Sequence, residues 1–466
     1  MLGMGNMRQW LMNISLVGGW FPAAAFAVIA VLSVTLLVSA AVSKRVGRIL
    51  ATVLPIGVAA VSGMVGYVVA WLLSDVFVVF GVGLGSRVMS WVAAGFAIAG
   101  FAIVHIVLSR GMMRVAAAIL TVFAILAAAI GIDQSYGEYA TIGSLFGEDS
   151  YSQADLTGLA KRKDLITVAQ WRKQAANGTI RNIPANGTVN KIDIPATKSQ
   201  FEARKALVYL PPAALADSKR KPALPVVLML SGQPGSPGRV FQAGGIQTMM
   251  DGYAKTHDGL APIVIAADQL GADSHNTLCV DSKVYGNALT YLTQDVVDWV
   301  KTNLPAAQDA KDWAIAGFSQ GATCSLQIGV NHPDLFGTMI PTDSEIKPTN
   351  GSRQEMIDRF FDGDTTAYEN QVPVNAIRNH APTHQMLIIG AGEKDATSIR
   401  NVKTIAPVAA KAGMRVAAVE SSGNAHDWHA VQDVLRYGLA VFGHDTGLDG
   451  ANPNLSDYPN LKRITI

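Results

Sequence analysis

The stretch WAIAGFSQGATCSLQ, residues 313–327, places a serine between two glycines directly after a short apolar run. Gly317 to Gly321 form the pattern G-x-S-x-G, and the residues that follow are typical of a helix. On a strand–turn–helix, small residues on both sides of the serine let the backbone turn sharply and expose the hydroxyl. Ser319 is therefore predicted to be a nucleophile, and a plain tight turn is the alternative interpretation.

A serine hydroxyl is a weak nucleophile at neutral pH and needs a neighbouring base. On a sheet of this kind the partners follow the serine in the order acid, then histidine. The apolar run RVAAVE is followed by His426 and His429. We expect His426 to be the base because it lies in the loop directly after the strand, whereas His429 lies a turn into the next helix.

The acid is expected from the loop after the preceding strand, QMLIIG, which offers Glu393 and Asp395. Asp395 is predicted to orient His426 and to stabilise its imidazolium. Glu393 is the reserve acid. Asp343 and Glu345, which follow the apolar run GTMIP, occupy a less favoured acid position.

The oxyanion that develops during acyl transfer needs preorganised donors. One donor is predicted to be the backbone N–H of Gln320, directly after the nucleophile. The second is assigned to the backbone N–H of Gln233, in the loop SGQPGSPG at 231–238. The glycines of that loop also suit a simple turn, and both interpretations hold together.

The loops that carry these residues must lie at one edge of a sheet. The sequence pattern from residue 191 to 445 predicts such a sheet. Short apolar runs alternate with helical stretches, which indicates a mostly parallel sheet covered on both faces, doubly wound. In such sheets the sites form outside the carboxyl ends of the strands. The runs lie at 206–210, 225–230, 262–267, 313–317, 337–341, 385–390 and 415–420.

The same residues resemble the putative-esterase branch of the α/β-hydrolases, which includes esterase D-type enzymes and actinobacterial mycolyltransferases. The resemblance covers about residues 200–442. It depends on LMLSGQPG, CVDSKVYGNALTYLTQDVVDWV, WAIAGFSQGATCSLQIGVNHPDLF, GAGEKD and NAHDWHAV. It implies that Ser319 is the nucleophile, Asp395 the acid and His426 the base.

The N-terminal third is more apolar than the rest of the chain, with very few charged residues between residues 15 and 135. The chain as a whole is 50% hydrophobic and only 15% charged, against about 25% charged in a typical soluble protein. Apolar stretches long enough to cross a membrane as helices lie at 20–42, 49–73, 91–109 and 115–132. Residues 1–135 are therefore predicted to form a four-helix transmembrane bundle.

The short loops predict how this bundle is oriented. Lys44, Arg45 and Arg48 lie between the first two stretches, and Arg110 and Arg114 lie between the last two. Because loops rich in Lys and Arg stay in the cytoplasm, both termini and the catalytic domain are expected outside the cytoplasm. Cysteine pairs outside the cytoplasm tend to oxidise, so a Cys279–Cys324 disulfide is predicted, with two buried free thiols as the alternative.

The remaining segments are expected to be a juxtamembrane linker at 136–190 and a C-terminal tail at 446–466. A net charge of +2 without long basic runs gives no argument for nucleic acid. No metal or cofactor is expected, and the oligomeric state is left open.

The function expected from these features is a membrane-anchored extracytoplasmic serine esterase. Its ester would belong to a lipid or cell-envelope component, for example an aminoacyl- or acyl-lipid. The segment 343–383 is the expected lid. The alternatives are an acyltransferase that moves the acyl group to a sugar or lipid hydroxyl, and a catalytically dead membrane interaction module.

Overall fold

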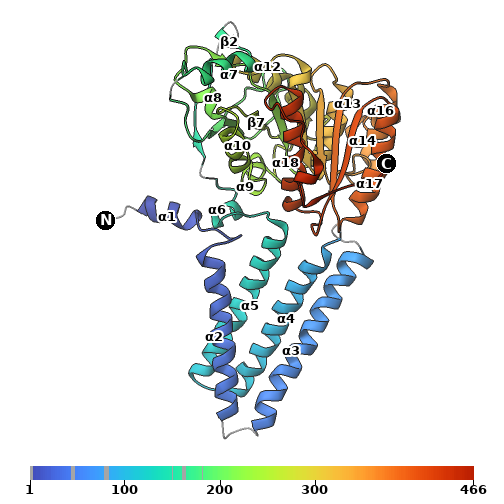
Figure 1. The fold of residues 1–466 in the computed structure, drawn as a ribbon. Coiled ribbons are helices and arrows are strands. Elements are labelled where there is room, and N and C mark those ends of the chain that lie inside the picture. Colours follow the sequence, from blue (N-terminus) through green and yellow to red (C-terminus); the bar gives the residue numbers. More distant parts are fainter. Residues whose placement is uncertain (1–3, 43–47, 78–82, 150, 160–163, 181) are drawn as a thin grey trace. The chain divides into compact units, whose positions relative to one another are not determined.

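The computed structural model describes the 466 residues except 1–3, 43–47, 78–82, 150, 160–163 and 181 (Figure 1). Lys44 and Arg45, on which part of the orientation argument depends, lie outside the described residues. The chain divides into two compact units. One is Met1–Glu148 together with Ala425–Asp427, and the other is Asp149–Asn424 together with Trp428–Ile466.

The first unit is helical. Its elements are α1 (Met4–Met12), α2 (Trp20–Val42), α3 (Arg48–Trp71) with a π-helical turn at Leu72–Val76, α4 (Gly85–Leu108), α5 (Met112–Tyr136) and α6 (Ile142–Leu145). Four helices are long and apolar enough to cross a membrane, namely Trp20–Val42, Ala51–Val76, Gly85–Leu108 and Met112–Tyr136. The predicted four-helix N-terminal region is therefore confirmed.

The outward faces of these helices are apolar, and their inward faces carry small residues. Val107 is 71% exposed and Val122 is 65% exposed, which suits a hydrocarbon surrounding far better than water. A Cβ atom added at Gly66 would lie 2.7 Å from the Phe96 ring. Small residues of this kind let membrane helices approach closely, so α3 and α4 pack directly against each other.

The second unit is built on one ten-stranded sheet with the order β1-β3-β4-β7-β6-β10-β11-β12-β13-β14. The strands from β7 to β13 in that order are parallel, while β4 and β14 pair antiparallel with their neighbours. The strands are β1 (Ser152–Gln153), β3 (Thr188–Ile192), β4 (Ala206–Leu210), β6 (Val226–Leu230), β7 (Ile263–Ala266), β10 (Trp313–Phe318), β11 (Thr338–Thr342), β12 (Met386–Gly392), β13 (Arg415–Ser421) and β14 (Leu461–Arg463).

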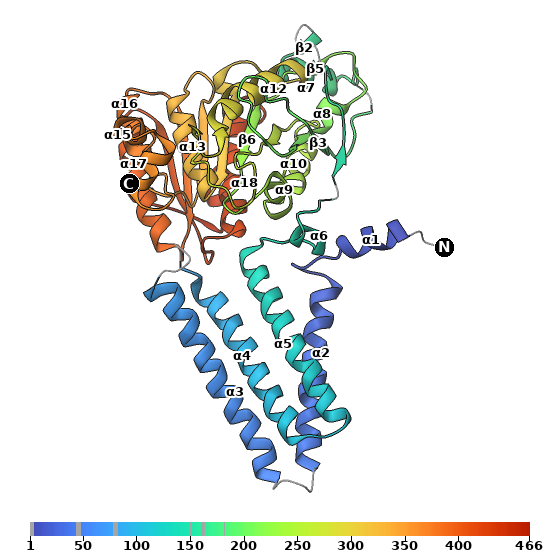
Figure 2. The same cartoon turned by 180° about the vertical axis from the view of Figure 1, so that it is seen from behind.

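Helices cover both faces of this sheet. Because successive strand residues point to opposite faces, Ile315 of β10 packs in one core while Ala314 and Ala316 pack in the other. Helix α18 lies in front of the sheet in Figure 1 and α13 lies in front in Figure 2. The covering helices are α9 (Pro237–Ala243), α10 (Ile246–Lys255) and α18 (Trp428–Asp445) on one face, and α12 (Val296–Asn303), α13 (Gln320–Asn331) and α17 (Ala396–Lys411) on the other.

The chain changes direction across the sheet at β6. This strand pairs with β7 on one side and with β10 on the other, so the chain leaves β6 for β7 and later returns to the opposite side. Sheets of this type bind their ligands at such a switch point, beyond the carboxyl ends of the strands. The loops after β6, β7 and β10 are therefore the first place to look for a site.

Smaller elements complete the second unit. The segment expected to be a linker contributes β1 and α7, whose Trp171 side chain is fully buried, and the segment expected to be a tail contributes β14. The remaining elements are β2 (Leu165–Ile166), α7 (Val168–Ala176), α8 (Pro212–Leu215), β5 (Lys221–Pro222), β8 (Asp281–Ser282), β9 (Gly286–Asn287), α11 (Ala288–Thr290), the π-helical turn Tyr291–Asp295, α14 (Arg353–Phe360), α15 (Thr365–Glu369) and α16 (Pro373–Asn379).

Candidate active site

Ser319 lies at the turn between β10 and α13. Its φ of 55° is in the left-handed region, which non-glycine residues seldom adopt. A Cβ atom on Gly317 would lie 2.2 Å from the Gly321 carbonyl oxygen, and one on Gly321 would lie 2.3 Å from the Ser231 carbonyl oxygen. Only glycine fits at either position, so the two glycines of G-x-S-x-G permit the turn that carries the serine.

The loop after β6 passes beside this turn. A Cβ atom on Gly232 would lie 3.6 Å from the Cβ of Ser319. Gln233 is the next residue, and its side-chain amide donates to the Ser274 carbonyl at 3.3 Å. Gln320 is the first residue of α13, and the first N–H groups of a helix have no partner within it. The structure therefore brings the elements of both predicted oxyanion donors next to Ser319.

Two carboxylates lie at the carboxyl ends of β11 and β12, and one imidazole follows β13 along the chain. Asp343 is the first residue after β11, Asp395 is the third residue after β12, and His426 is the fifth residue after β13. Both carboxylates belong to buried residues, and His426 is half-buried. The predicted acid and the predicted base thus follow neighbouring parallel strands, and Asp343, which the sequence did not favour, follows the next strand of the sheet.

Each of the two acids is held by backbone N–H groups. Oδ1 of Asp395 accepts from Thr397 at 3.1 Å and from Ser398 at 3.0 Å, which makes it the N-cap of α17. Oδ1 of Asp343 accepts from the Gly392 N–H at 2.9 Å. These bonds fix the carboxylates rotationally.

The reserve acid, Glu393, has other partners. Its carboxylate pairs with Lys462 at 2.9 Å and accepts from the Gly423 N–H at 2.7 Å. The hydrogen bond from Lys462, followed by that from Gly423, lowers the pKa of this exposed carboxyl. Glu393 therefore ties β14 and the loop after β13 to the end of β12.

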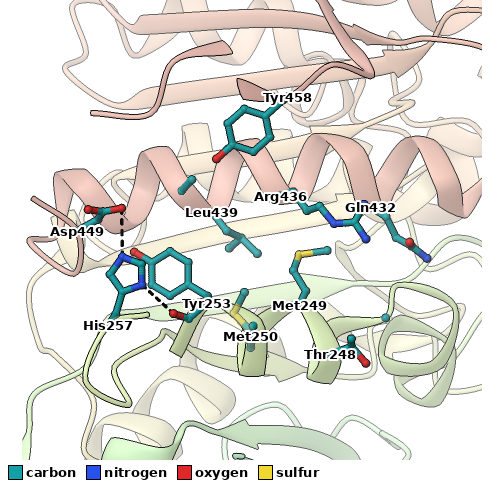
Figure 3. A pocket seen from close by; sticks show the side chains of 13 residues that line it. Thr248, Met249, Met250, Tyr253, His257, Gln432, Arg436, Leu439, Asp449 and Tyr458 are labelled. Carbon is teal, nitrogen blue, oxygen red and sulfur yellow. Dashed lines mark hydrogen bonds and ion pairs between the residues drawn. The ribbon is translucent and has the colours of Figure 1, made fainter. Parts of the chain in front are cut away.

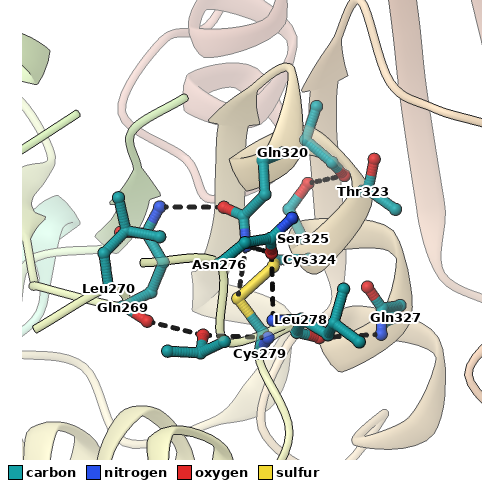
Figure 4. Close-up of a disulfide and its surroundings, with 12 residues drawn as sticks. Gln269, Leu270, Asn276, Leu278, Cys279, Gln320, Thr323, Cys324, Ser325 and Gln327 are labelled. Atoms are coloured by element: carbon teal, nitrogen blue, oxygen red, sulfur yellow. Dashed lines mark hydrogen bonds between the residues drawn. A yellow bond between two sulfur atoms is a disulfide. The ribbon is translucent and has the colours of Figure 1, made fainter. Parts of the chain in front are cut away.

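The predicted disulfide between Cys279 and Cys324 is present (Figure 4). It joins the loop after β7 to α13, the helix that begins at the predicted nucleophile. The Gln320 side chain lies over it, with Nε2 at 3.3 Å from Asn276 Oδ1 and 3.7 Å from Cys279 Sγ. The bond therefore belongs to the surroundings of the candidate site.

A separate pocket of about 650 Å³ lies along α10 and α18 (Figure 3). Its imidazole, that of His257, stacks on Tyr253 with ring centroids 4.1 Å apart and pairs with Asp449 at 3.2 Å. The residues that line it come from helix faces and from the segment before β14, and none is a predicted catalytic residue. The predicted catalytic residues thus lie after the strand ends and do not line this pocket.

The family comparison matches the part of the chain that carries most of the sheet. Residues 198–438 match the family described as Putative esterase. An uncharacterised protein of Corynebacterium glutamicum is 33% identical over 319 residues, which are 66% of this chain and 71% of that protein.

Two solved structures are similar to the second unit. An S-formylglutathione hydrolase from Agrobacterium tumefaciens is 16% identical, with a TM-score of 0.46 over 57% of this chain and 98% of that one. A ferulic acid esterase from Anaeromyces mucronatus is 18% identical, with a TM-score of 0.42 over 55% of this chain and 90% of that one. With the family match across its sheet and its strand-end loops, the chain belongs to the putative esterase family.

Proposed function

We propose that the chain is a membrane-anchored serine esterase whose catalytic unit faces away from the cytoplasm. Membership of an esterase family and four helices able to cross a membrane are the established part. The observation that carries the proposal is the sharp turn at Ser319 between β10 and α13, with Asp395 after β12 and His426 after β13, two strands that follow β10 in the chain. Ser319, His426 and Asp395 have the residue types and the chain order of a serine-hydrolase triad.

In this mechanism the Ser319 hydroxyl attacks the ester carbonyl carbon while His426 accepts its proton. The carbonyl oxygen becomes an oxyanion, and the N–H groups of Gln320 and Gln233 stabilise it. The tetrahedral intermediate then collapses, and His426 returns the proton to the leaving alcohol. A water molecule, deprotonated by His426, releases the acyl group from Ser319. Asp395 holds the imidazole and stabilises its cationic form.

The substrate proposed is an ester of a lipid or cell-envelope component, for example an aminoacyl- or acyl-lipid. The four apolar helices support this because they would keep the catalytic unit at a bilayer, where such esters are presented. The basic loop residues Arg110 and Arg114 support the outward orientation under the positive-inside rule.

Acyl transfer is the second candidate, because it shares the acyl-enzyme and differs only in the acceptor. The ratio of free acid to acylated product, measured with one acyl donor and added sugar or lipid alcohols, separates the two reactions. Excess free acid supports the esterase, and acylated acceptor as the main product supports the transferase.

A fluorophosphonate probe tests the nucleophile in the full-length protein. Labelling is expected in the wild type and in Ser325→Ala, and it is expected to vanish in Ser319→Ala. Ser325 is a matched control because it is a buried serine of the same helix whose hydroxyl bonds the Ala322 carbonyl.

Labelling and turnover are also expected to persist in EDTA, because no step requires a metal. An unlabelled wild type would instead favour the catalytically inactive interaction module. Loss of activity in EDTA would show that a metal ion takes part and would contradict this mechanism.

A further inference from the structure

The side chain of Gln269 lies between the two loops that carry the proposed oxyanion donors. Gln269 is three residues beyond the end of β7 and is fully buried. Its Nε2 lies 2.7 Å from the Ser231 carbonyl oxygen, 3.3 Å from Ser231 Oγ and 3.2 Å from Gln320 Oε1. Figure 4 shows the amide of Gln269 pointing toward the side chain of Gln320.

The two residues that accept from this amide, Ser231 and Gln320, belong to the segments that carry the proposed oxyanion donors. Ser231 begins the loop that contains Gln233, and Gln320 itself carries the other proposed N–H donor. One side chain thus bridges the end of β6 and the start of α13. The spacing between the two N–H donors depends on how these segments are held relative to each other.

Gln269 and Gln320 are themselves held from behind. The Thr277 hydroxyl donates to the Gln269 backbone carbonyl at 2.7 Å. The Gln320 amide reaches Asn276 and the disulfide sulfur of Cys279. Because a hydrogen bond lost from a buried group is costly, these contacts favour one arrangement of Gln269 Nε2 and of the Gln320 amide, while Gln269 Oε1 has no hydrogen-bond partner among the described residues.

We propose that Gln269 is a positioning residue that sets the separation of the two oxyanion donors. This inference rests on the proposed function. Gln269 touches neither the substrate nor Ser319 in this role, and it acts through Ser231 and Gln320. Because preorganised donors contribute mainly to the transition state, its loss affects kcat much more than KM.

The test compares Gln269→Met with Gln327→Met in the full-length protein, using a soluble chromogenic ester. Gln327 is a matched control, a buried amide on α13 whose Nε2 donates to the Leu278 carbonyl at 3.3 Å and to Gln371 Oε1 at 3.4 Å, and not to Ser231 or Gln320. For Gln269→Met we expect kcat to fall about tenfold or more. This loss is expected not to exceed the loss that follows removal of an oxyanion donor itself. KM is expected to stay within about twofold, since ground-state binding is kept.

Two further readouts separate positioning from simple destabilisation. The affinity for a boronic acid, which mimics the tetrahedral intermediate, is expected to fall in Gln269→Met and to be kept in Gln327→Met. In Gln269→Glu, kcat relative to wild type is expected to rise as pH falls, because a protonated carboxyl regains the missing donor.

Equal kcat losses in Gln269→Met and Gln327→Met, in proportion to their losses in Tm, would overturn the inference. If turnover requires Ser319 but is unaffected by Gln269→Met, the inference about Gln269 is overturned and the proposed function stands. Absence of any Ser319-dependent turnover in the wild type would overturn it together with the proposed function.

Discussion

At residue 343 the chain offers a second candidate for the catalytic acid. Asp343 and Asp395 are both buried, and each accepts from a backbone N–H with one carboxylate oxygen. Asp395 follows β12, the strand position from which the triad order expects its acid. Asp343 follows β11 with a φ of 54°, so it is placed by a constrained backbone.

Asp395→Asn is expected to lower kcat by about three to four orders of magnitude, because an amide cannot stabilise the imidazolium and favours the wrong tautomer. Asp343→Asn is expected to cost about tenfold, since it removes only a nearby negative charge. The measurement is kcat for both variants on one soluble ester. A larger loss in Asp343→Asn would reassign the acid.

The sequence predicted Ser319, His426 and Asp395 as candidates because each follows an apolar run with a recognisable pattern. It ranked Asp343 below Asp395, and it offered no signal for Gln269. The role of such residues depends on which loops converge, and convergence depends on pairings between strands far apart in the chain. A glutamine after a strand has no local pattern that marks it as a bridge.

At the scale of elements, the loop after β7 and helix α13 act as one body. The Cys279–Cys324 disulfide links them, and Gln327 of α13 donates to the Leu278 carbonyl in the same loop. The alternation of strands and helices was predictable from apolar runs. The edge strands β1 and β14 were not, because strands of two or three residues carry almost no periodic signal and depend on their neighbours.

Cys279→Ser combined with Cys324→Ser is expected to reduce the free energy of unfolding by about 4 kcal/mol in the chain-entropy model. The comparison is urea unfolding of the double variant against the oxidised wild type. Reduced wild-type protein is the control and is expected to match the variant. Equal stability of oxidised and reduced protein would contradict the expectation.

Asp295 connects the helix that leads into α12 with the segment before β4. Burial alone raises the pKa of its carboxyl, but hydrogen bonds from Ser199, Lys198 and Thr197 outweigh burial and hold the pKa below its usual value. A lowered folded-state pKa adds stability above the unfolded pKa, and that stability is lost as pH falls through the folded value.

Asp295→Asn is therefore expected to destabilise the protein fully at pH 7, with the gap to wild type closing below about pH 4. Urea unfolding at several pH values measures the gap. Asp298→Asn is the control, because Asp298 is an exposed acid of the following helix, α12, that pairs with exposed Lys198, and such pairs contribute little. A gap that stays constant with pH would contradict the assignment.

At the scale of the whole molecule, the chain joins a set of membrane-type helices to an esterase fold. The basic loops predict that the catalytic unit lies outside the cytoplasm. The Cys279–Cys324 disulfide agrees with that proposal, since disulfides persist in oxidising compartments. Long apolar helices were the easiest part to predict, because length and composition alone define them.

A C-terminal epitope tag after Ile466 is expected to be digested by protease added to intact spheroplasts. A tag placed in the loop that contains Arg110 is expected to survive until the membrane is permeabilised. Immunoblotting against each tag reads the result. The reverse pattern would place the catalytic unit in the cytoplasm and would remove the argument for an envelope ester.

The two glycines beside Ser319 have a consequence for how this protein could lose its activity. Replacing the serine removes one oxygen atom and leaves the turn intact, whereas any side chain at Gly317 or Gly321 collides with backbone atoms. Related proteins that have lost catalysis but keep a structural role would therefore have replaced Ser319 and kept Gly317 and Gly321. The residues at these three positions in a newly sequenced relative would distinguish an active enzyme from an inactive one.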